Sequence, residues 1–233
     1  MTAPLNLLCA GAAQGLIKAL EAEFAARTGT TLASSFGAVG AMKEALLAGA
    51  PCDLMIVTDA MVAALCDSGQ LLPASRAALG RVRTGLALRA GDAAPDAASP
   101  EALRAALLAA PAIYFPDPAR ATAGIHFADV MRQLGIFEVL APRLRTFPNG
   151  ATAMRALAAS ADAGAIGCTQ ITEILYTDGI VLLGALPPQF DLATVYTAAV
   201  SATAAQPALA AQFIAMLAGA GSRAVRQAGG FEF

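Results

Sequence analysis

The sequence predicts an α/β protein made of two lobes, each a mainly parallel sheet flanked by helices. Short apolar runs, typical of buried strands, alternate with longer segments in which apolar residues recur every three or four positions, as on one face of a helix. This alternation restarts after a loop over residues 91–96, which indicates a second sheet. Hydrophobic residues make up 57% of the 233 residues, which is enough for two cores. Because such sheets bind ligands at the carboxyl ends of their strands, we expect a ligand cleft between the lobes.

The first part of the chain predicts three strands, each followed by a helix. The first helix shows the pattern clearly, since Leu16, Leu20 and Phe24 share one face and charged residues lie elsewhere. The expected strands cover residues 5–10, 31–36 and 54–57, and the helices that follow them stop at Gly29, Gly49 and Gly69.

The rest of the chain continues this alternation. Ser99 and Pro100 predict a helix start, because serine caps the first N–H groups and proline suits the first helical position. Thr122 and Asn149 are expected to cap two later helices. The remaining strands are expected over residues 81–89, 113–115, 164–167, 180–183 and 193–200, with a short extended piece before 147 and helices over 100–110, 122–134, 150–157 and 207–219.

Four strand-to-helix turns rich in small residues are candidates for an anion site. The central one covers residues 36–43, where Gly37 and Gly40 let the backbone approach a ligand and the next helix directs unpaired N–H groups toward it. Similar turns occupy residues 8–15, 118–125 and 165–170. Because helix N-termini attract negative charge, these turns together predict a small anionic ligand.

Composition and residue spacing argue against several other functions. The net charge is −2 and the basic residues are scattered, so we expect no nucleic-acid partner. No apolar run reaches the roughly 18 residues of a membrane span, so we expect no membrane insertion. One histidine and four cysteines without metal-type spacing predict reduced thiols and no metal site. The turn over 11–15 matches neither phosphate-binding fingerprint, so no cofactor is expected.

The beginning of the chain leaves two locations open. It runs almost directly into a strand, without a basic and apolar leader. We therefore expect a periplasmic protein if a signal peptide has been removed, and a cytoplasmic protein otherwise.

Taken in order, four segments resemble the molybdate-binding-protein family of ABC-transporter solute receptors, which have the type II periplasmic binding fold. The segments cover residues 36–40, 47–56, 121–125 and 161–167. The resemblance implies two α/β lobes joined by a double crossover, with lobe I formed by residues 1–82 and 200–233 and lobe II by residues 83–199. It also implies a monomer that serves an ABC permease and holds an oxyanion through backbone N–H groups and hydroxyls.

Departures from that family pattern argue against molybdate or tungstate as the ligand. Family members that bind molybdate place a serine in each of the first two turns. Here these places are occupied by Ala12 or Ala13 with Gln14, and by Val39. The family's late tyrosine corresponds to Cys168. Because each lost donor would cost about 1 to 3 kcal/mol in a desolvated site, a small organic anion with one to three carboxylates fits better.

The candidate site residues come from these turns and strand ends. Arg120 could make a bidentate contact with a carboxylate of the ligand, or it could be a solvated loop residue. His126 could contact the ligand, or it could pack against neighbouring residues or cap the helix. Asp59 and Asn149 also fit helix caps, Glu173 fits a helix surface, and all three tyrosines fit the core or the hinge. The candidate ligand-binding residues are Ala12, Ala13, Gln14, Ala38, Val39, Gly40, Thr58, Arg120, Thr122, Ala123, Gly124, Ile125, His126, Asn149, Cys168, Thr169 and Gln170.

Two functions remain open on this scaffold. The first is a receptor that captures a small organic anion and presents it to a permease. The second is an enzyme, because a few relatives of the resembling family are aconitate isomerases, which move a double bond in a tricarboxylate by proton transfer. Such an enzyme needs a base, and His126 and Asp59 are the candidates. We expect the receptor. A cytoplasmic anion sensor lacks support, since no DNA-binding element is visible.

Overall fold

The computed structural model describes residues 3–233, which form two compact α/β units. The first unit combines the described residues up to Val82 with Thr194–Phe233, and the second is Arg83–Ala193. The backbone passes from the first to the second within β4 (Ala77–Arg89) and returns at the start of β9 (Ala193–Val200). The predicted α/β class, with sheets flanked by helices, is confirmed.

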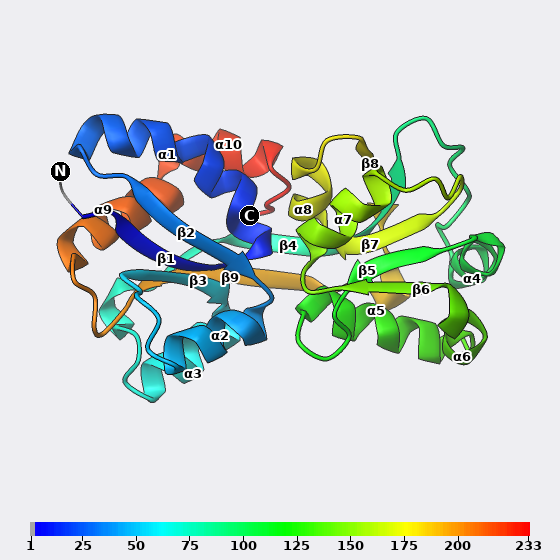
Figure 1. The fold of residues 1–233 in the computed structure, drawn as a ribbon, viewed down its shortest axis with the longest axis horizontal. Coiled ribbons are helices and arrows are strands. Elements are labelled where there is room, and N and C mark those ends of the chain that lie inside the picture. Colours follow the sequence, from blue (N-terminus) through cyan, green and yellow to red (C-terminus); the bar gives the residue numbers. More distant parts are fainter. Residues whose placement is uncertain (1–2) are drawn as a thin grey trace. The chain divides into compact units, whose positions relative to one another are not determined.

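The first unit has a sheet in the strand order β2-β1-β3-β9. Strand β1 is parallel to both β2 and β3, and β9 is antiparallel to β3. In Figure 1, α1, α9 and α10 cover one face of this sheet and α2 and α3 cover the other. The elements are β1 (Leu5–Ala10), α1 (Gln14–Thr28), β2 (Leu32–Gly37), α2 (Val39–Leu47), β3 (Leu54–Thr58), α3 (Asp59–Asp67), α9 (Pro207–Ala218) and α10 (Arg223–Ala228).

The second unit has the strand order β4-β7-β5-β6, with β8 also paired to β4. Strand β5 is parallel to β6 and β7, whereas β4 is antiparallel to β7 and β8. Helices α7 and α8 lie on one face of this sheet and α5 on the other (Figure 1). The elements are α4 (Pro100–Ala109), β5 (Ile113–Pro116), α5 (Thr122–Gln133), α6 (Phe137–Leu140), β6 (Leu144–Phe147), α7 (Gly150–Ala158), β7 (Ile166–Gln170), α8 (Ile171–Tyr176) and β8 (Ile180–Ala185).

The helix starts agree only in part with the predicted caps. Ser99 and Asn149 cap α4 and α7 through their side-chain oxygens, as predicted. At α5 the prediction is wrong, because Ala121 occupies the cap position and Thr122 is the first helical residue. Strand β7 is also displaced from the prediction, since it continues to Gln170 rather than ending at Gly167.

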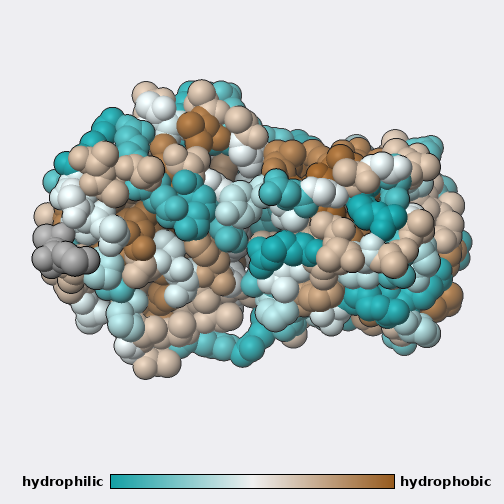
Figure 2. Space-filling view, turned by 45° about the horizontal axis from the view of Figure 1, so that its top comes forward, coloured by the Kyte–Doolittle hydropathy of each residue, from teal (hydrophilic) through white to brown (hydrophobic). Residues whose placement is uncertain are grey.

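Of the three tyrosines expected in the core or the hinge, two are buried. Tyr114 and Tyr196 are almost completely buried. Tyr176 is 39% exposed at the end of α8, beside the exposed Leu175, and Val181 of β8 is exposed as well. Figure 2 shows brown, apolar residues gathered where α8 lies in Figure 1. Tyr176 thus lies neither in the core nor where the chain passes between the units, so the expectation for it is wrong.

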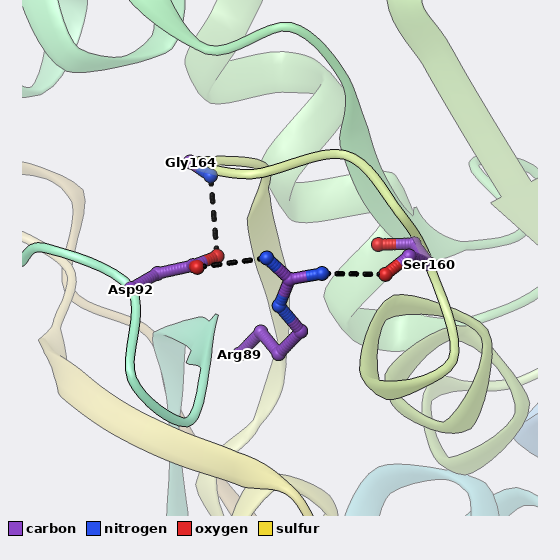
Figure 3. Close-up of polar contacts among 4 residues, drawn as sticks. All are labelled: Arg89, Asp92, Ser160 and Gly164. Carbon is purple, nitrogen blue, oxygen red and sulfur yellow. Dashed lines mark hydrogen bonds and ion pairs between the residues drawn. The ribbon is translucent and has the colours of Figure 1, made fainter.

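An ion pair holds the segment that leads into β7. Arg89, at the end of β4, pairs with Asp92 at 2.9 Å and donates to the carbonyl oxygen of Ser160 at 2.6 Å (Figure 3). Asp92 also accepts a hydrogen bond from the backbone N–H of Gly164 at 3.1 Å. These contacts join the loops after β4 and before β7, so they support the position of β7.

No single helix among residues 3–233 is long and apolar enough to cross a membrane. One pair, Pro207–Ala218 with Ala220–Ala228, meets the length and composition criteria together but bends by 50° at its break.

A buried carboxylate joins distant segments of the first unit. Asp53, which is 1% exposed, accepts hydrogen bonds from the backbone N–H of Asn6 at 2.8 Å and from its side-chain amide at 3.2 Å. Its other oxygen accepts from the backbone N–H of Gln206 at 2.9 Å, directly before α9. The carboxylate thus connects β1, β3 and α9.

We predict that Asp53→Ala lowers the free energy of unfolding by about 3 kcal/mol, because three donors lose a charged acceptor and two of them are backbone groups. Urea unfolding monitored by circular dichroism measures this change. Asp67→Ala, at an exposed position of the same unit, is the matched control and should change the free energy by less than about 0.5 kcal/mol. Equal effects of the two substitutions would contradict the role assigned to Asp53.

Candidate functional site

Three helix starts lie along one edge of the first unit. Strands β1, β2 and β3 are parallel and adjacent, so their carboxyl ends share this edge. Each strand leads directly into helical turns: a short 3-10 turn (Gly11–Ala13) and α1 follow β1, α2 follows β2, and α3 follows β3. The register of the sheet therefore brings together the turns that the sequence singled out in this unit.

The first turns of these helices offer backbone donors in an apolar setting. The cap positions Ala10, Ala38 and Thr58 make no side-chain hydrogen bond to their helices. No acidic residue occupies the first turn of α1 or α2, so their partial positive charge is not neutralised there. The side chains of Ala12, Ala13, Ala38 and Val39 are buried, while Gln14 and Gly40 are partly exposed.

Asp59 is engaged in a polar contact at this edge. It is the first residue of α3, with Thr58 at the cap position, so the alternative that Asp59 is the cap is wrong. Its Oδ1 accepts a hydrogen bond from Thr197 at 2.8 Å and pairs with Arg76 at 2.9 Å. The hydrogen bond from Thr197, followed by that from Arg76, lowers the pKa of Asp59. These contacts favour the ionised carboxylate and make it a weaker base.

Three helix starts also follow the parallel strands of the second unit. Strands β5, β6 and β7 end at a common edge and lead to α5, α7 and α8.

At the start of α7, a side chain of the protein accepts hydrogen bonds from the first turn of the helix. The Asn149 side-chain oxygen accepts from the Thr152 backbone N–H and from its hydroxyl, each at 2.9 Å. The predicted capping role of Asn149 is therefore present.

Glu173 places a buried carboxylate against the same helix start. One carboxylate oxygen accepts from the Ala151 backbone N–H at 3.3 Å, and the other accepts from the Thr169 hydroxyl at 2.5 Å. A Cβ atom at Gly150 would lie 2.0 Å from Glu173, so this approach requires glycine. Burial raises the pKa of Glu173, although the hydrogen bonds from Thr169 and backbone N–H groups oppose the shift.

The expectation that Glu173 lies on a helix surface is wrong, since the residue is 5% exposed. A signal for the buried position was present in the sequence. Glu173 is the third residue of α8 after the cap position Gln170, where a glutamate often reaches back to the N–H of the cap residue. The hydrogen bond from the backbone N–H of Gln170 to Glu173 follows this pattern.

The three candidates at the end of β7 differ in their surroundings. Cys168 is completely buried in the apolar core beneath α5, and burial raises the pKa of its thiol well above the usual value. Thr169 points to the opposite face, where it donates to Glu173. Gln170 is 3% exposed, and its amide makes no hydrogen bond to any described residue.

The start of α5 carries the other candidates. Arg120 is exposed in the loop before this helix, Thr122 is partly exposed, Ala123 and Gly124 are buried, and Ile125 is 47% exposed. The His126 Nε2 lies 2.7 Å from the carbonyl oxygen of Phe190. Because a carbonyl only accepts, Nε2 is the donor in this contact, and Nδ1 takes no part in it.

The four cysteines form no disulfide among residues 3–233, and three of them are buried. Residues 3–233 contain no group of three or more His, Cys, Asp or Glu side chains that could hold a metal ion.

Two α/β units, each with helix starts at the carboxyl ends of parallel strands, agree with the type II periplasmic binding fold. The chain belongs to the bacterial extracellular solute-binding proteins, whose family model matches residues 5–232. It is also 25% identical over 220 residues to an aconitate isomerase from Pseudomonas sp., covering 92% of this chain and 82% of that protein.

Solved structures show the same fold. The periplasmic molybdate-binding protein of Azotobacter vinelandii matches with a TM-score of 0.79 and 22% identity, covering 98% of this chain and 99% of that one. The sulfate-binding protein SubI of Mycobacterium tuberculosis H37Rv matches with a TM-score of 0.76 and 17% identity, covering 99% of this chain and 86% of that one. PEB3 with bound L-phospholactate matches with a TM-score of 0.71 and 14% identity, covering 98% and 99%.

We predict that the unfolding free energy of the Glu173→Gln protein, relative to that of the unchanged protein, increases as pH rises above about 4.5. The folded protein holds the pKa of Glu173 above its usual 4.5, so folding favours the protonated carboxyl. That contribution is present at low pH and is lost as pH rises through the raised pKa. Glutamine does not titrate, so the Glu173→Gln protein does not lose stability in this way as pH rises.

Urea unfolding between pH 4 and 8 measures the difference in unfolding free energy between the two proteins. Glu138→Gln, at an exposed position of α6, serves as the control and should give a difference that changes little with pH. A Glu173→Gln difference that stays flat or falls with pH would overturn the assignment.

Proposed function

We propose that this chain captures a small organic anion with one to three carboxylates in the periplasm and delivers it to an ABC-type permease. The observation that carries the proposal is the edge of the first unit, where helix starts without side-chain caps lie beside the buried side chains of Ala12, Ala13 and Val39. Backbone N–H groups suit the carboxylates, and no hydroxyl side chain stands at these three positions.

Inorganic oxyanions fit this edge less well. A tetrahedral oxyanion presents acceptors on all sides and is best held by many donors. Alanine and valine provide none at the places where related molybdate-binding proteins carry serine, so an organic ligand is the better match. The relatives named for molybdate, sulfate and L-phospholactate support an anion on this fold, and the last of these ligands is organic.

The second unit would contribute the residues around the start of α5. We propose that Arg120 pairs with a ligand carboxylate and that the backbone over 122–125 donates hydrogen bonds. Gln170 completes this set at the end of β7. The protein would act as a monomer, as the receptor function requires only one copy of each unit.

We predict that a panel of di- and tricarboxylates binds saturably, in titration calorimetry, and that molybdate does not displace them. The panel includes succinate, L-malate, tricarballylate, citrate and both aconitate isomers. Arg120→Ala should weaken binding of the tightest member about tenfold or more, since a charge-assisted contact is lost.

Arg132→Ala, near the other end of α5, is the matched control and should bind as the unchanged protein does. Tight molybdate binding that competes with the carboxylates would replace the organic anion with an oxyanion. Binding by none of these acids would refute the proposed ligand class.

A second function is favoured by the aconitate isomerase of Pseudomonas sp., which aligns with 92% of this chain. On this alternative, a base removes a proton from one carbon of an unsaturated tricarboxylate and the proton is returned to another carbon. The Nδ1 atom of His126 is free of the contact to Phe190 and fits this role. Asp59 is the other candidate, although its pairing with Arg76 makes it a weaker base.

Proton NMR in D2O separates the two functions. The isomerase predicts that one aconitate isomer converts into the other, with exchange of a carbon-bound proton for deuterium. His126→Ala should then slow conversion at least about 100-fold while ligand signals still broaden on binding, and Asp59→Asn tests the second base in the same way. Broadened signals without conversion or exchange favour the receptor.

A further inference from the structure

Four residues of the second unit carry buried side-chain polar atoms without a hydrogen-bond partner among residues 3–233. One is Ser160, in the loop before β7. The other three lie at or beside the end of β7: Thr84, which is 0% exposed, Gln170, which is 3% exposed, and Thr172, which is 5% exposed. The atoms concerned are the two threonine hydroxyls and both the oxygen and the nitrogen of the Gln170 amide. Buried polar groups in proteins are usually paired, so this concentration at one strand end requires an explanation.

The register of the sheet places two of these groups side by side. Thr84 of β4 stands directly opposite Gln170 of β7 in an antiparallel pair, so their side chains lie on the same face. The next pair on that face, Leu86 and Cys168, packs in the core with Phe127 of α5. The amide and the Thr84 hydroxyl therefore lie where the apolar face beneath α5 reaches the carboxyl end of β7.

On the opposite face of the same strand end, the polar side chain has a hydrogen-bond partner. Thr169 donates to Glu173, whose carboxylate also accepts from the backbone of α7. The protein thus pairs its polar groups on one face of β7 and leaves them unpaired on the other. This contrast indicates a ligand. An unpaired buried amide lowers the stability of the folded protein, and a residue with a purely structural role would not be expected to do so.

The chemistry of the amide defines the ligand further. A glutamine amide has two N–H donors and one acceptor oxygen, and either orientation of the amide leaves both kinds of group to satisfy. An anion with acceptors alone can pair with Nε2 but not with Oε1. A ligand with a hydroxyl beside a carboxylate can pair with both, since the hydroxyl donates to Oε1 and the carboxylate accepts from Nε2.

We propose that Gln170 selects ligands that carry a hydroxyl next to a carboxylate, and so makes this chain a receptor for hydroxy acids. Thr84 and Thr172 support this selection, because a hydroxyl can donate or accept as the ligand requires. The inference rests on the proposed function, whose ligand it specifies.

Matched pairs of acids test the selection directly. Succinate and L-malate differ by one hydroxyl, as do tricarballylate and citrate. Titration calorimetry should show that the unchanged protein binds the hydroxy acid of a pair about tenfold or more tightly than its partner. Gln170→Met should reduce this ratio to within about twofold, mainly by weakening the hydroxy acid. Gln133→Met, at an exposed position of α5, should leave the ratio unchanged.

The melting temperature of the ligand-free protein provides a second readout. If Gln170 serves a ligand, Gln170→Met removes an unpaired buried amide and should raise the melting temperature, by about 2 to 4 °C. If the amide had a structural role, the same substitution would lower it. A lowered melting temperature together with an unchanged binding ratio would overturn the inference.

The outcomes also separate this inference from the proposed function. Equal ratios in the unchanged protein and in Gln170→Met would refute selection by Gln170 and leave the carboxylate receptor standing. Binding by no acid of either pair, hydroxylated or not, would refute the receptor for carboxylates and the inference with it.

Discussion

The buried carboxylate of Asp53 is the constraint on which the first unit depends. It accepts hydrogen bonds from Asn6 and Gln206, so it joins the beginning of β1 to the beginning of α9. The backbone oxygen of the same residue accepts from Ser201, just after β9. These contacts fix β3 between its neighbours at one end of the sheet. The helix starts at the other end are then held in register, since a shift by one residue would turn every side chain to the opposite face.

The helix starts differ in whether the protein itself supplies acceptors to their backbone N–H groups. In the second unit, Asn149 and Glu173 supply acceptors to α7 from within the protein, and Gly150 provides the space for them. The starts of α1 and α2 in the first unit, and of α5 in the second, have neither acidic residues nor side-chain caps. A helix start that is already neutralised gains little from an external anion, whereas one that is not retains its attraction. The distribution of internal acceptors thus favours the starts of α1, α2 and α5 as the sources of backbone donors.

Local patterns predicted the fold well, and long-range contacts account for the errors. Apolar periodicity and glycine stops located most strands and helices because these signals lie within each element. The end of β7 was predicted too early, since Thr169 and Gln170 look like loop residues until pairing with β4 buries them. Glu173 occupies a local capping position, but its contact with Ala151, 22 residues away, is visible only in the tertiary structure. The ligand-binding residues stay predictions, as contact with a ligand depends on groups that only tertiary structure assembles.

The path of the chain through the two units has a consequence for synthesis on the ribosome. The second unit is one continuous segment, Arg83–Ala193, so it can fold as soon as it emerges. The first unit begins earlier but lacks β9 and α9 until residues 193–218 have been made. Asp53 meets Gln206, its partner 153 residues later, only then. The edge of β3 that pairs with β9 therefore stays open until β9 has been made, and a nascent chain of this kind would benefit from a chaperone that shields that strand.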